Sequence, residues 1–493
     1  MAGNLTDFLP SVAASFRWCD GLFPASTAAV VFFMLWRNHR SKIIFPFGKH
    51  AYFTLLIFLC ALLAVNLSIR GGFLTVYRNM KSSAHRHASG PPLYTLFGTL
   101  YFDYADELPE LTEEQEHEIH NWLSERPALV PVPDIASRDN CIFILAESLE
   151  SWVLNLTVEN QEITPYLNKL LKERSTLYAP HVLTQVNGGR SIDAQLLVLA
   201  GLLPLQTGAY SCRFPLNTYH TLPKAMKELK ETRNYLLTVD KTKTWNQGAV
   251  ARSFGIDTIV SYPDFRMTEA FGNRKRLGDN AFFSQCREKM ENGEIWRSDE
   301  NVFIQMVTYS GHSPFKMPES LKTVHFSNRI PEIMADYMTV AHYTDEAIGK
   351  FVEYLRTRPE YGRTMVVITG DHEGLADNRK DLCRTKAGKG IVSENEFTPF
   401  IVLNSPIAMY HTKVMGQVDI YTTLLNLLGL ESYRWSGIGQ SILDSGKPGV
   451  AISPKRSIEG DTMFLSREEL LRMRQSQVIS DRIIRFDKLK DLR

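Results

Sequence analysis

The sequence predicts an α/β domain with a largely parallel central sheet flanked by helices, and a membrane region ahead of that domain. From residue 139 onward, short apolar runs alternate with helical patterns, which is typical of parallel strands buried between two layers of helices. Near the N-terminus, two uncharged apolar runs approach the length of a membrane-spanning helix. The chain has 493 residues, more than one hydrophobic core usually supports, so we expect more than one structural unit.

Residues 1–70 are predicted to form a membrane region with about two transmembrane helices. Residues 51–69 carry no charged side chain. At 1.5 Å per residue this run spans about 28 Å, against a hydrocarbon core of about 30 Å. The run 21–36 is also uncharged, but it is shorter and contains Pro24. A buried core helix is the alternative interpretation of both runs.

The loop between the two apolar runs indicates their orientation. Its basic residues are Arg37, Arg40, Lys42 and Lys49. Cytoplasmic loops are enriched in Lys and Arg, so this loop is predicted to be cytoplasmic. The rest of the chain then lies outside the cytoplasm, in the periplasm or the extracellular space.

The composition narrows the classes of function. The net charge is only +1, so no large excess of cations is present, and nucleic acid is not expected as a partner. The six cysteines show no CxxC or zinc-finger spacing. The sequence leaves a disulfide among Cys212, Cys286 and Cys383 as an alternative, since that part of the chain is expected outside the cytoplasm.

The remaining chain divides into three segments. Residues 71–138 have a mixed composition with a helix-prone acidic stretch at 111–127, and we interpret them as a juxtamembrane helical linker. We place the α/β domain at 139–445 and a C-terminal tail with an amphipathic helical pattern at 446–493.

Apolar runs and helical patterns alternate within the α/β domain. The runs that predict buried strands are 141–146, 235–239, 302–309, 365–369 and 399–403, and the predicted helices are 165–174, 222–231, 331–357 and 418–429. Polar residues follow four of these runs: Glu147, Asp240, Ser310 to His312, and, after Gly370, Asp371 with His372. Ligands of open α/β sheets bind beyond the carboxyl ends of the strands, so we expect these side chains to converge in one cleft.

The side chains at the predicted strand ends are suited to a divalent metal. Asp371 and His372 combine a hard oxygen donor with an imidazole, which suits zinc or manganese. Glu147 alone could be a loop carboxylate, and His312 alone could belong to a turn. Because each stands at the end of a different strand, their combination favours a metal site.

Ser191 lies between a glycine-rich break at 187–189 and an apolar helical pattern that begins at about Ile192. A serine at this place is most often a helix N-cap. Alternatively, its hydroxyl attacks phosphorus, while the N–H groups and dipole of the helix hold the oxygens of the transferred group. A metal that lowers the pKa of the hydroxyl would activate it without a neighbouring base.

Four motifs, in this order, resemble those of the lipoteichoic acid synthase family. They are ILAESLESW around Glu147, GGRSIDAQ around Ser191, TYSGHSPF around His312 and ITGDHEG around Asp371 and His372. The family is a membrane-anchored group of phosphoglycerol transferases in the sulfatase-like branch of the alkaline phosphatase superfamily. The resemblance covers about residues 139–445 and implies an alkaline-phosphatase/sulfatase-like fold.

The resemblance implies one bound divalent metal, usually manganese, with zinc and magnesium as alternatives. Its ligands would be Glu147, Ser191, Asp371 and His372, and Ser191 takes the place of the family's usual threonine nucleophile. The resemblance also implies that Arg190, Trp245 and His312 contact the substrate, and that His312 assists the leaving group.

The resemblance further implies transfer of a phosphoglycerol-type head group from a phospholipid donor to a glycan or lipid-linked acceptor. Two departures weaken the assignment of the head group: Gln247 stands in place of the family's arginine, and Thr238 stands at or beside the position of a histidine. A phosphoethanolamine transferase and a sulfuric or phosphoric ester hydrolase are therefore alternatives. A formylglycine sulfatase is disfavoured because Ser191 is not followed by x-Pro-x-Arg. A catalytically silent lipid or polymer binder is the non-enzyme alternative.

Overall fold

The computed structural model describes residues 57–81 except 59, 63, 66 and 70, and further 101, 110–129, 131–132, 136, 138–272 and 275–491. These residues divide into two compact units. The described residues before position 110 form one unit together with Gln206–Gly208. The described residues of Glu110–Leu205 and Ala209–Arg493 form the larger unit.

The smaller unit contains helical residues between positions 57 and 69, and helix α4 (Phe73–Lys81). The predicted span 21–36 lies outside the described residues, and the span 51–69 is described only from residue 57 and with gaps. None of the helices that the structure describes has both the length and the apolar character needed to cross a membrane. The two membrane spans stay predictions.

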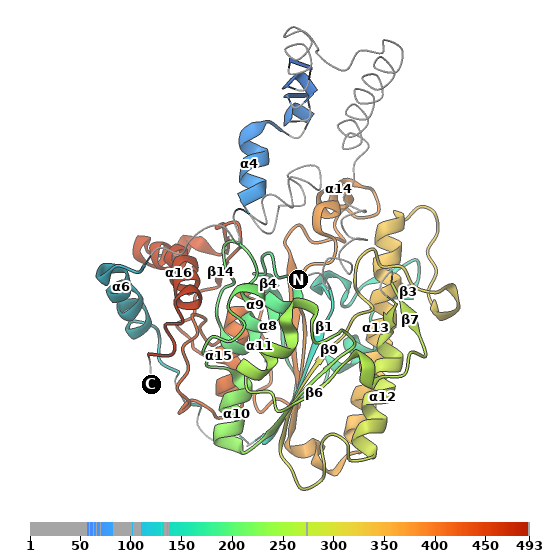
Figure 1. Ribbon diagram of the computed structural model, residues 1–493. Helices are drawn as coiled ribbons and strands as arrows, with labels where there is room; N and C mark the ends of the chain where they lie inside the picture. Colours follow the sequence, from blue (N-terminus) through green and yellow to red (C-terminus); the bar gives the residue numbers. More distant parts are fainter. Residues whose placement is uncertain are drawn as a thin grey trace, which may run out of the picture. The chain divides into compact units, whose positions relative to one another are not determined.

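A mixed, mostly parallel sheet forms the centre of the larger unit (Figure 1). Its strands are β1 (Asn140–Ala146), β4 (Leu177–Leu183), β5 (Arg233–Thr238), β6 (Thr258–Val260), β9 (Val302–Val307), β10 (Thr364–Gly370), β11 (Phe397–Leu403), β12 (Met409–Tyr410) and β13 (Met415–Gly416). The order is β12-β4-β11-β10-β1-β9-β5-β6, and β13 pairs with β4. Strands β10, β1, β9, β5 and β6 are parallel, whereas β11 runs antiparallel to both β10 and β4. The predicted α/β fold is confirmed, and all five predicted strands are present.

Strand β1 shows why these strands read as continuous apolar runs. All seven of its residues are buried, and they alternate between the two faces of the sheet. Cys141, Phe143 and Leu145 join one core, and Ile142 and Ile144 join the other. A strand covered on both faces has no polar face to interrupt the run.

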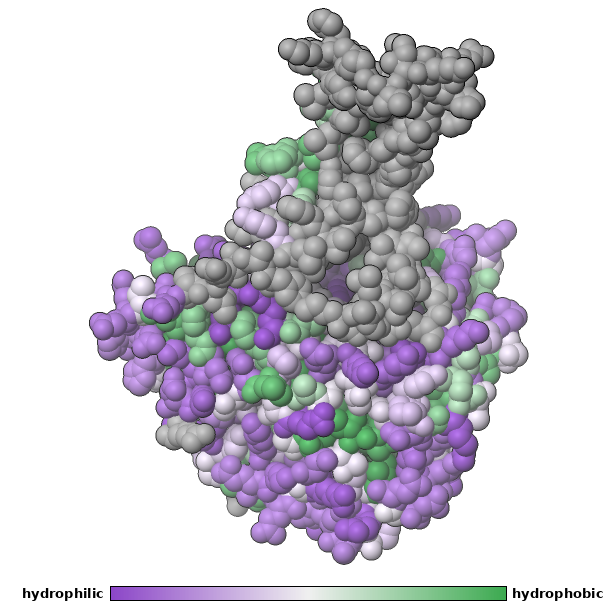
Figure 2. All heavy atoms as spheres, in the orientation of Figure 1, coloured by the Kyte–Doolittle hydropathy of each residue, from purple (hydrophilic) through white to green (hydrophobic). Residues whose placement is uncertain are grey.

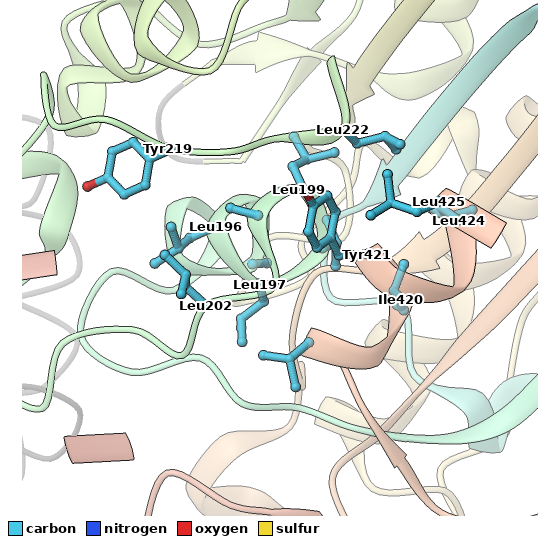
Figure 3. Packing of buried hydrophobic residues seen from close by; sticks show 14 of the residues in the cluster. Leu196, Leu197, Leu199, Leu202, Tyr219, Leu222, Ile420, Tyr421, Leu424 and Leu425 are labelled. Atoms are coloured by element: carbon cyan, nitrogen blue, oxygen red, sulfur yellow. The ribbon is translucent and has the colours of Figure 1, made fainter. Parts of the chain in front are cut away.

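Helices cover both faces of the sheet (Figure 1). One face carries α8 (Ser191–Ala200), α10 (Leu222–Lys230) and α15 (Val418–Leu427), and the other carries α7 (Pro165–Leu170), α12 (Asp279–Glu291) and α13 (Glu332–Thr357). The four predicted helices correspond to α7, α10, α13 and α15. Helices α8 and α15 contact each other, and Leu199 of α8 belongs to the same core as Tyr421 and Leu424 of α15 (Figure 3). This packing fixes α8, which carries Ser191 at its first position.

The segments before and after the α/β domain pack on the same core. Helix α6 (Glu113–Ser124), from the predicted linker, contacts α16 (Arg467–Arg485), from the predicted tail. Arg472 of α16 lies over the ring of Trp122 at 4.3 Å and donates to its carbonyl oxygen at 2.8 Å. Ile479 and Ile483 of α16 are buried in the core that also holds α8. Residues 110–129 and 446–491 are thus parts of the larger unit, and the apolar face of the amphipathic tail helix packs inward.

Shorter elements complete the described fold: α9 (Tyr210–Arg213), α11 (Gln247–Ser253), α14 (Arg379–Arg384), β2 (Thr157–Val158), β3 (Gln161–Glu162), β7 (Ala270–Phe271), β8 (Arg276–Leu277), β14 (Val450–Ile452) and β15 (Ile458–Gly460). The side of the larger unit seen in Figure 2 is mostly hydrophilic, with scattered apolar patches. Within the described part of the chain, no disulfide joins Cys212, Cys286 and Cys383.

Candidate active site

Three metal-competent side chains meet at the carboxyl edge of the sheet. Glu147 follows β1, and Asp371 and His372 follow β10, whose last residue Gly370 pairs with Ala146 of β1. The Nε2 atom of His372 lies 3.5 Å from Glu147 Oε1 and 3.4 Å from Asp371 Oδ2. All three side chains are buried, and they form a group that could hold a metal ion. The parallel register of two neighbouring strands therefore brings these residues together.

Ser191 joins this group from the start of α8. Its Oγ atom lies 3.3 Å from Glu147 Oε2 and 3.3 Å from His372 Nε2. The four residues expected as ligands thus lie together, and we call Glu147, Ser191, Asp371 and His372 the four-donor cluster.

The interpretation of Ser191 as a helix N-cap is wrong. The N-cap of α8 is Arg190, whose backbone has φ 52° and ψ −119°, and Ser191 occupies the first helical position. The N-cap makes no side-chain capping hydrogen bond, and Asp193 Oδ2 instead holds the turn before the helix by accepting the N–H groups of Asn187 at 3.0 Å and Gly189 at 2.9 Å. The Ser191 hydroxyl therefore points to the cluster.

The donor geometry fits a small divalent cation. Asp371 Oδ1 accepts the N–H groups of Ser148 at 2.7 Å and His372 at 2.8 Å, while its buried Oδ2 has no hydrogen-bond partner among the described residues. Neighbouring donors in the cluster lie 3.3–3.5 Å apart. Metal–ligand bonds of about 2.0–2.2 Å in a tetrahedral arrangement would place neighbouring donors about 3.3–3.6 Å apart. The orphaned oxygen and these separations are what a cation site requires.

Ser148 orients two of the four donors. Besides its N–H bond to Asp371, its hydroxyl donates to Glu147 Oε1 at 3.1 Å. Ser148 has φ 55°, and the hydroxyl of Tyr337 from α13 holds this turn by donating to the Ser148 carbonyl oxygen at 2.7 Å and accepting the Glu150 N–H at 2.9 Å. Such hydrogen bonds fix the direction of metal ligands.

A buried ion pair holds the two ligand loops together. Glu150 Oε1 accepts the N–H groups of Gly374 at 2.8 Å and Leu375 at 3.1 Å, and its Oε2 pairs with Arg379. The loop after β1 is thus tied to the loop after β10. The loop after β9 packs as closely, because a Cβ on Gly311 would collide with the carbonyl oxygen of Glu147.

The electrostatics of the cluster favour a bound cation. Burial, with Asp371 close by, raises the pKa of Glu147 well above its usual range. Burial, with Arg190 close by, lowers the pKa of His372. The lowered pKa favours the neutral imidazole. The tautomer with its hydrogen on Nδ1 would donate to the Glu373 carbonyl oxygen at 2.9 Å and would leave the lone pair of Nε2 facing the other donors.

Arg190 lies beside the cluster, next to Ser191 in the chain. Its guanidinium forms an ion pair with Glu373, and its Nη2 donates to the Glu373 carbonyl oxygen at 3.0 Å. The sequence indicated Arg190 but not its partner, although Glu373 stands inside the motif ITGDHEG.

His312 and Trp245 lie outside the four-donor cluster, in loops at the same edge of the sheet. His312 follows β9, and its ring stacks on Tyr309 with 5.2 Å between centroids. Thr308 in the same loop accepts the Glu147 N–H at 2.9 Å. Trp245 follows β5 in a short 3-10 helix (Thr244–Asn246) and packs against the core that contains α8.

The two positions that depart from the family pattern are both buried. Thr238 ends β5, and Gln247 begins α11. Asp240, after the same strand, forms a 2.7 Å ion pair with Arg276 and adds to the rise in the pKa of Glu147. Arg276 stands in no motif that sequence analysis could have singled out.

Comparison with known proteins places this site in a family. The sulfatase family profile matches residues 139–430. The chain belongs to the sulfatase family and is an enzyme of that family.

Two curated relatives carry the name that the motifs indicated. The chain is 24% identical to the lipoteichoic acid synthase-like protein YvgJ of Bacillus subtilis over 356 residues, which cover 70% of this chain and 56% of the relative. It is also 24% identical to the lipoteichoic acid synthase of Staphylococcus aureus over 468 residues, covering 90% of this chain and 70% of the relative. The chain thus spans little more than half the length of the first relative. The resemblance inferred from the motifs is confirmed.

A solved structure supports the fold. The crystal structure of the lipoteichoic acid synthase LtaP from Listeria monocytogenes has a TM-score of 0.61 and 17% sequence identity, over 75% of this chain and 98% of that chain. The alkaline-phosphatase/sulfatase-like fold implied by the motifs is therefore confirmed.

Proposed function

We propose that this enzyme is a membrane-anchored, metal-dependent transferase of the cell envelope. It moves a phosphoglycerol-type head group from a phospholipid to an acceptor outside the cytoplasm, through a phospho-Ser191 intermediate. The observation that carries the proposal is the position of Ser191 Oγ, 3.3 Å from both Glu147 Oε2 and His372 Nε2 at the first position of α8. The two relatives named lipoteichoic acid synthase support the substrate class.

In the first step, Ser191 Oγ attacks the phosphorus of the phospholipid. The Oγ–P bond forms, and the bond between phosphorus and the diacylglycerol oxygen breaks. Glu147 Oε2, which accepts the hydrogen bond of the Ser191 hydroxyl, takes its proton as Oγ attacks. His312 is the candidate that gives the diacylglycerol oxygen its proton. The N-terminus of α8 and the Arg190 guanidinium stabilise the negative charge on the other phosphate oxygens.

In the second step, a hydroxyl of the acceptor attacks the phosphoserine. A new O–P bond forms as His312 takes the proton of the attacking hydroxyl. The Oγ–P bond breaks as Glu147 returns its proton to Ser191 Oγ, which restores Ser191. The acceptor is a glycan or a lipid-linked molecule, and Trp245 is a candidate wall of the head-group pocket.

Glu147, Ser191, Asp371 and His372 would hold one divalent metal, with manganese as the first choice and zinc or magnesium as alternatives. When bound, the metal would lower the pKa of the serine hydroxyl and offset charge on the phosphate oxygens. Without it, two carboxylates this close to Ser191 would repel an anionic substrate.

The predicted membrane region supports a lipid donor. If 21–36 and 51–69 span the membrane and the basic loop between them is cytoplasmic, the larger unit lies on the outer side. An anchored domain would then meet phospholipid head groups without leaving the bilayer surface.

A test with labelled phospholipids decides between the head groups. Full-length protein with Mn²⁺ is incubated with vesicles that contain fluorescent phosphatidylglycerol or fluorescent phosphatidylethanolamine. We expect diacylglycerol release from phosphatidylglycerol, lost in Ser191→Ala and kept in the control Ser476→Ala on α16. Release from phosphatidylethanolamine alone would make the enzyme a phosphoethanolamine transferase. Hydrolysis of a soluble ester without turnover of either lipid would refute the lipid-transferase proposal.

A further inference from the structure

The partner of Arg190 is a carboxylate that stands next to a candidate metal ligand but does not belong to the cluster. Glu373 follows His372 directly, and its side chain turns to the start of α8. One carboxylate oxygen pairs with Arg190 Nη1, the other accepts the Thr184 hydroxyl at 3.3 Å, and the Glu373 carbonyl oxygen accepts Arg190 Nη2 at 3.0 Å. These three contacts connect the loops after β10 and β4 to Arg190, the residue that precedes Ser191.

The Arg190 guanidinium is held at one edge and open at another. Its Nη2 also lies 3.1 Å from His372 Nδ1, so the group stands against the cluster. The Arg190 side chain is 40% exposed, whereas that of Glu373 is 9% exposed. A guanidinium anchored by two of its N–H groups and open to solvent still has N–H groups to offer, and their planar arrangement suits phosphate oxygens.

The formal charges of these side chains explain why the position of Arg190 matters for phosphate binding. Glu147, Asp371 and Glu373 bring three carboxylates to one place, and Arg190 is the cation that contacts one of them directly. A divalent cation in the cluster would balance the remaining two negative charges. A phosphate group can then approach if Arg190 stays in place, because the charge of Arg190 lies next to Ser191 and faces solvent.

We propose that Glu373 is a positioning residue that holds the Arg190 guanidinium beside Ser191 and so builds a subsite for the phosphate oxygens of the substrate. This inference rests on the proposed function, since it takes an anionic phosphate ester as the substrate. Glu373 itself touches neither the substrate nor the metal.

The direction in which phosphate affinity changes in one variant distinguishes this positioning role from a general electrostatic effect. In Glu373→Gln a negative charge near the phosphate is lost, while the size of the side chain is kept. If Glu373 only repelled the substrate, phosphate would bind more tightly to the variant. If Glu373 positions Arg190, phosphate binds about tenfold more weakly, because the loss of one charged hydrogen bond corresponds to about 1.5 kcal/mol.

The experiment measures binding of inorganic phosphate to Mn²⁺-loaded full-length protein by titration calorimetry, together with Mn²⁺ affinity. We expect Glu373→Gln to weaken phosphate binding about tenfold and to change Mn²⁺ affinity less than twofold. Arg190→Met should weaken phosphate binding as much, and the double variant should be no weaker than Arg190→Met alone. Glu360→Gln is the matched control, because Glu360 is also a buried carboxylate paired with an arginine, Arg358, but precedes β10 at the opposite edge of the sheet.

The outcomes are distinct. Unchanged or tighter phosphate binding in Glu373→Gln, additive losses in the double variant, or no phosphate binding by the wild type would each overturn the positioning role. Phospholipid turnover is measured on the same proteins. If the wild type binds phosphate but turns over no phospholipid, the lipid-transferase proposal fails while the phosphate measurements still decide the role of Glu373.

Discussion

Removing one oxygen atom from Tyr337 tests whether the turn at Ser148 organises the candidate metal site. In Tyr337→Phe the ring keeps its stacking on Trp152 at 5.2 Å and its edge contact with Phe315 at 5.1 Å. The hydroxyl is the group that satisfies the Ser148 carbonyl oxygen and the Glu150 N–H. Ser148 is 3% exposed and Glu150 is 0% exposed, so water cannot readily replace the hydroxyl.

The expected cost follows from these two unpaired groups. A buried donor or acceptor left without a partner costs about 1–3 kcal/mol, so the loss of both partners should lower the free energy of unfolding by about 2–6 kcal/mol. The turn also directs Glu147 and Asp371 through Ser148. Loss of such support lowers metal affinity about 10–100-fold.

The assay is urea unfolding of metal-free full-length protein, followed by tryptophan fluorescence, together with Mn²⁺ titration of the folded protein. The dependence of unfolding free energy on urea should keep its slope, because the surface exposed on unfolding is the same. Tyr354→Phe is the matched control on the same helix. Its hydroxyl accepts one part-buried bond of 3.3 Å from Arg358, so we expect a loss below about 1 kcal/mol and no change in Mn²⁺ affinity. Equal effects of the two variants would show that the reasoning about Ser148 is wrong.

Three further substitutions test other parts of the site and core. Arg379→Met leaves the Glu150 carboxylate buried without its cation and should lower the free energy of unfolding by about 3–5 kcal/mol, with partial recovery when Glu150→Gln is added. Gly311→Ala puts a Cβ against the backbone of Glu147 and should lower Mn²⁺ affinity at least about tenfold by titration, since the loop must shift. Burial, followed by three nearby cations, lowers the pKa of His220 to about 4. Its folded pKa lies below the unfolded value of about 6.5, so the folded state binds fewer protons, and stability present above pH 6.5 is lost as the pH falls toward 4. Because His220 is partly exposed, urea unfolding at pH 7 and pH 4 should show a loss about 1–2 kcal/mol larger in the wild type than in His220→Gln.

The strands, and the edge of the sheet that holds the candidate active site, could be predicted because both depend on short stretches of sequence. Strands such as β1 and β10, buried on both faces, must be apolar throughout, and parallel neighbours bring their carboxyl ends together. Strand β4 was missed because Pro180 and His181 interrupt its run, although the structure buries most of it. The antiparallel direction of β11 could not be predicted, since an apolar run carries no sign of direction.

The contacts around the four-donor cluster join residues that are far apart in the sequence, and a local sequence pattern does not show such pairs. Arg190 and Glu373 are 183 residues apart, and their pairing needs both the register of β10 and the placement of α8. Arg276, which pairs with Asp240, lies in the short strand β8, and neither β8 nor its partner β7 has a clear apolar run. The membrane spans 21–36 and 51–69 stay predictions from hydropathy, because the first lies outside the described residues and the second is only partly described.

Ser191 shows how a frequent pattern can point to the wrong role. Serine at a helix start usually caps the helix by accepting a backbone N–H, which would occupy its oxygen. Here the N-cap has no side-chain capping bond. Asp193, two residues further on, holds the preceding turn by accepting two N–H groups, and Arg190 adopts φ 52° and ψ −119° before the helix begins. The Ser191 hydroxyl is thereby released from the local backbone and meets Glu147 and His372 instead. A hydroxyl directed to a carboxylate and an imidazole, at the positive end of a helix, is placed to react with an anionic ester, and this geometry is the strongest physical reason to regard Ser191 as the nucleophile.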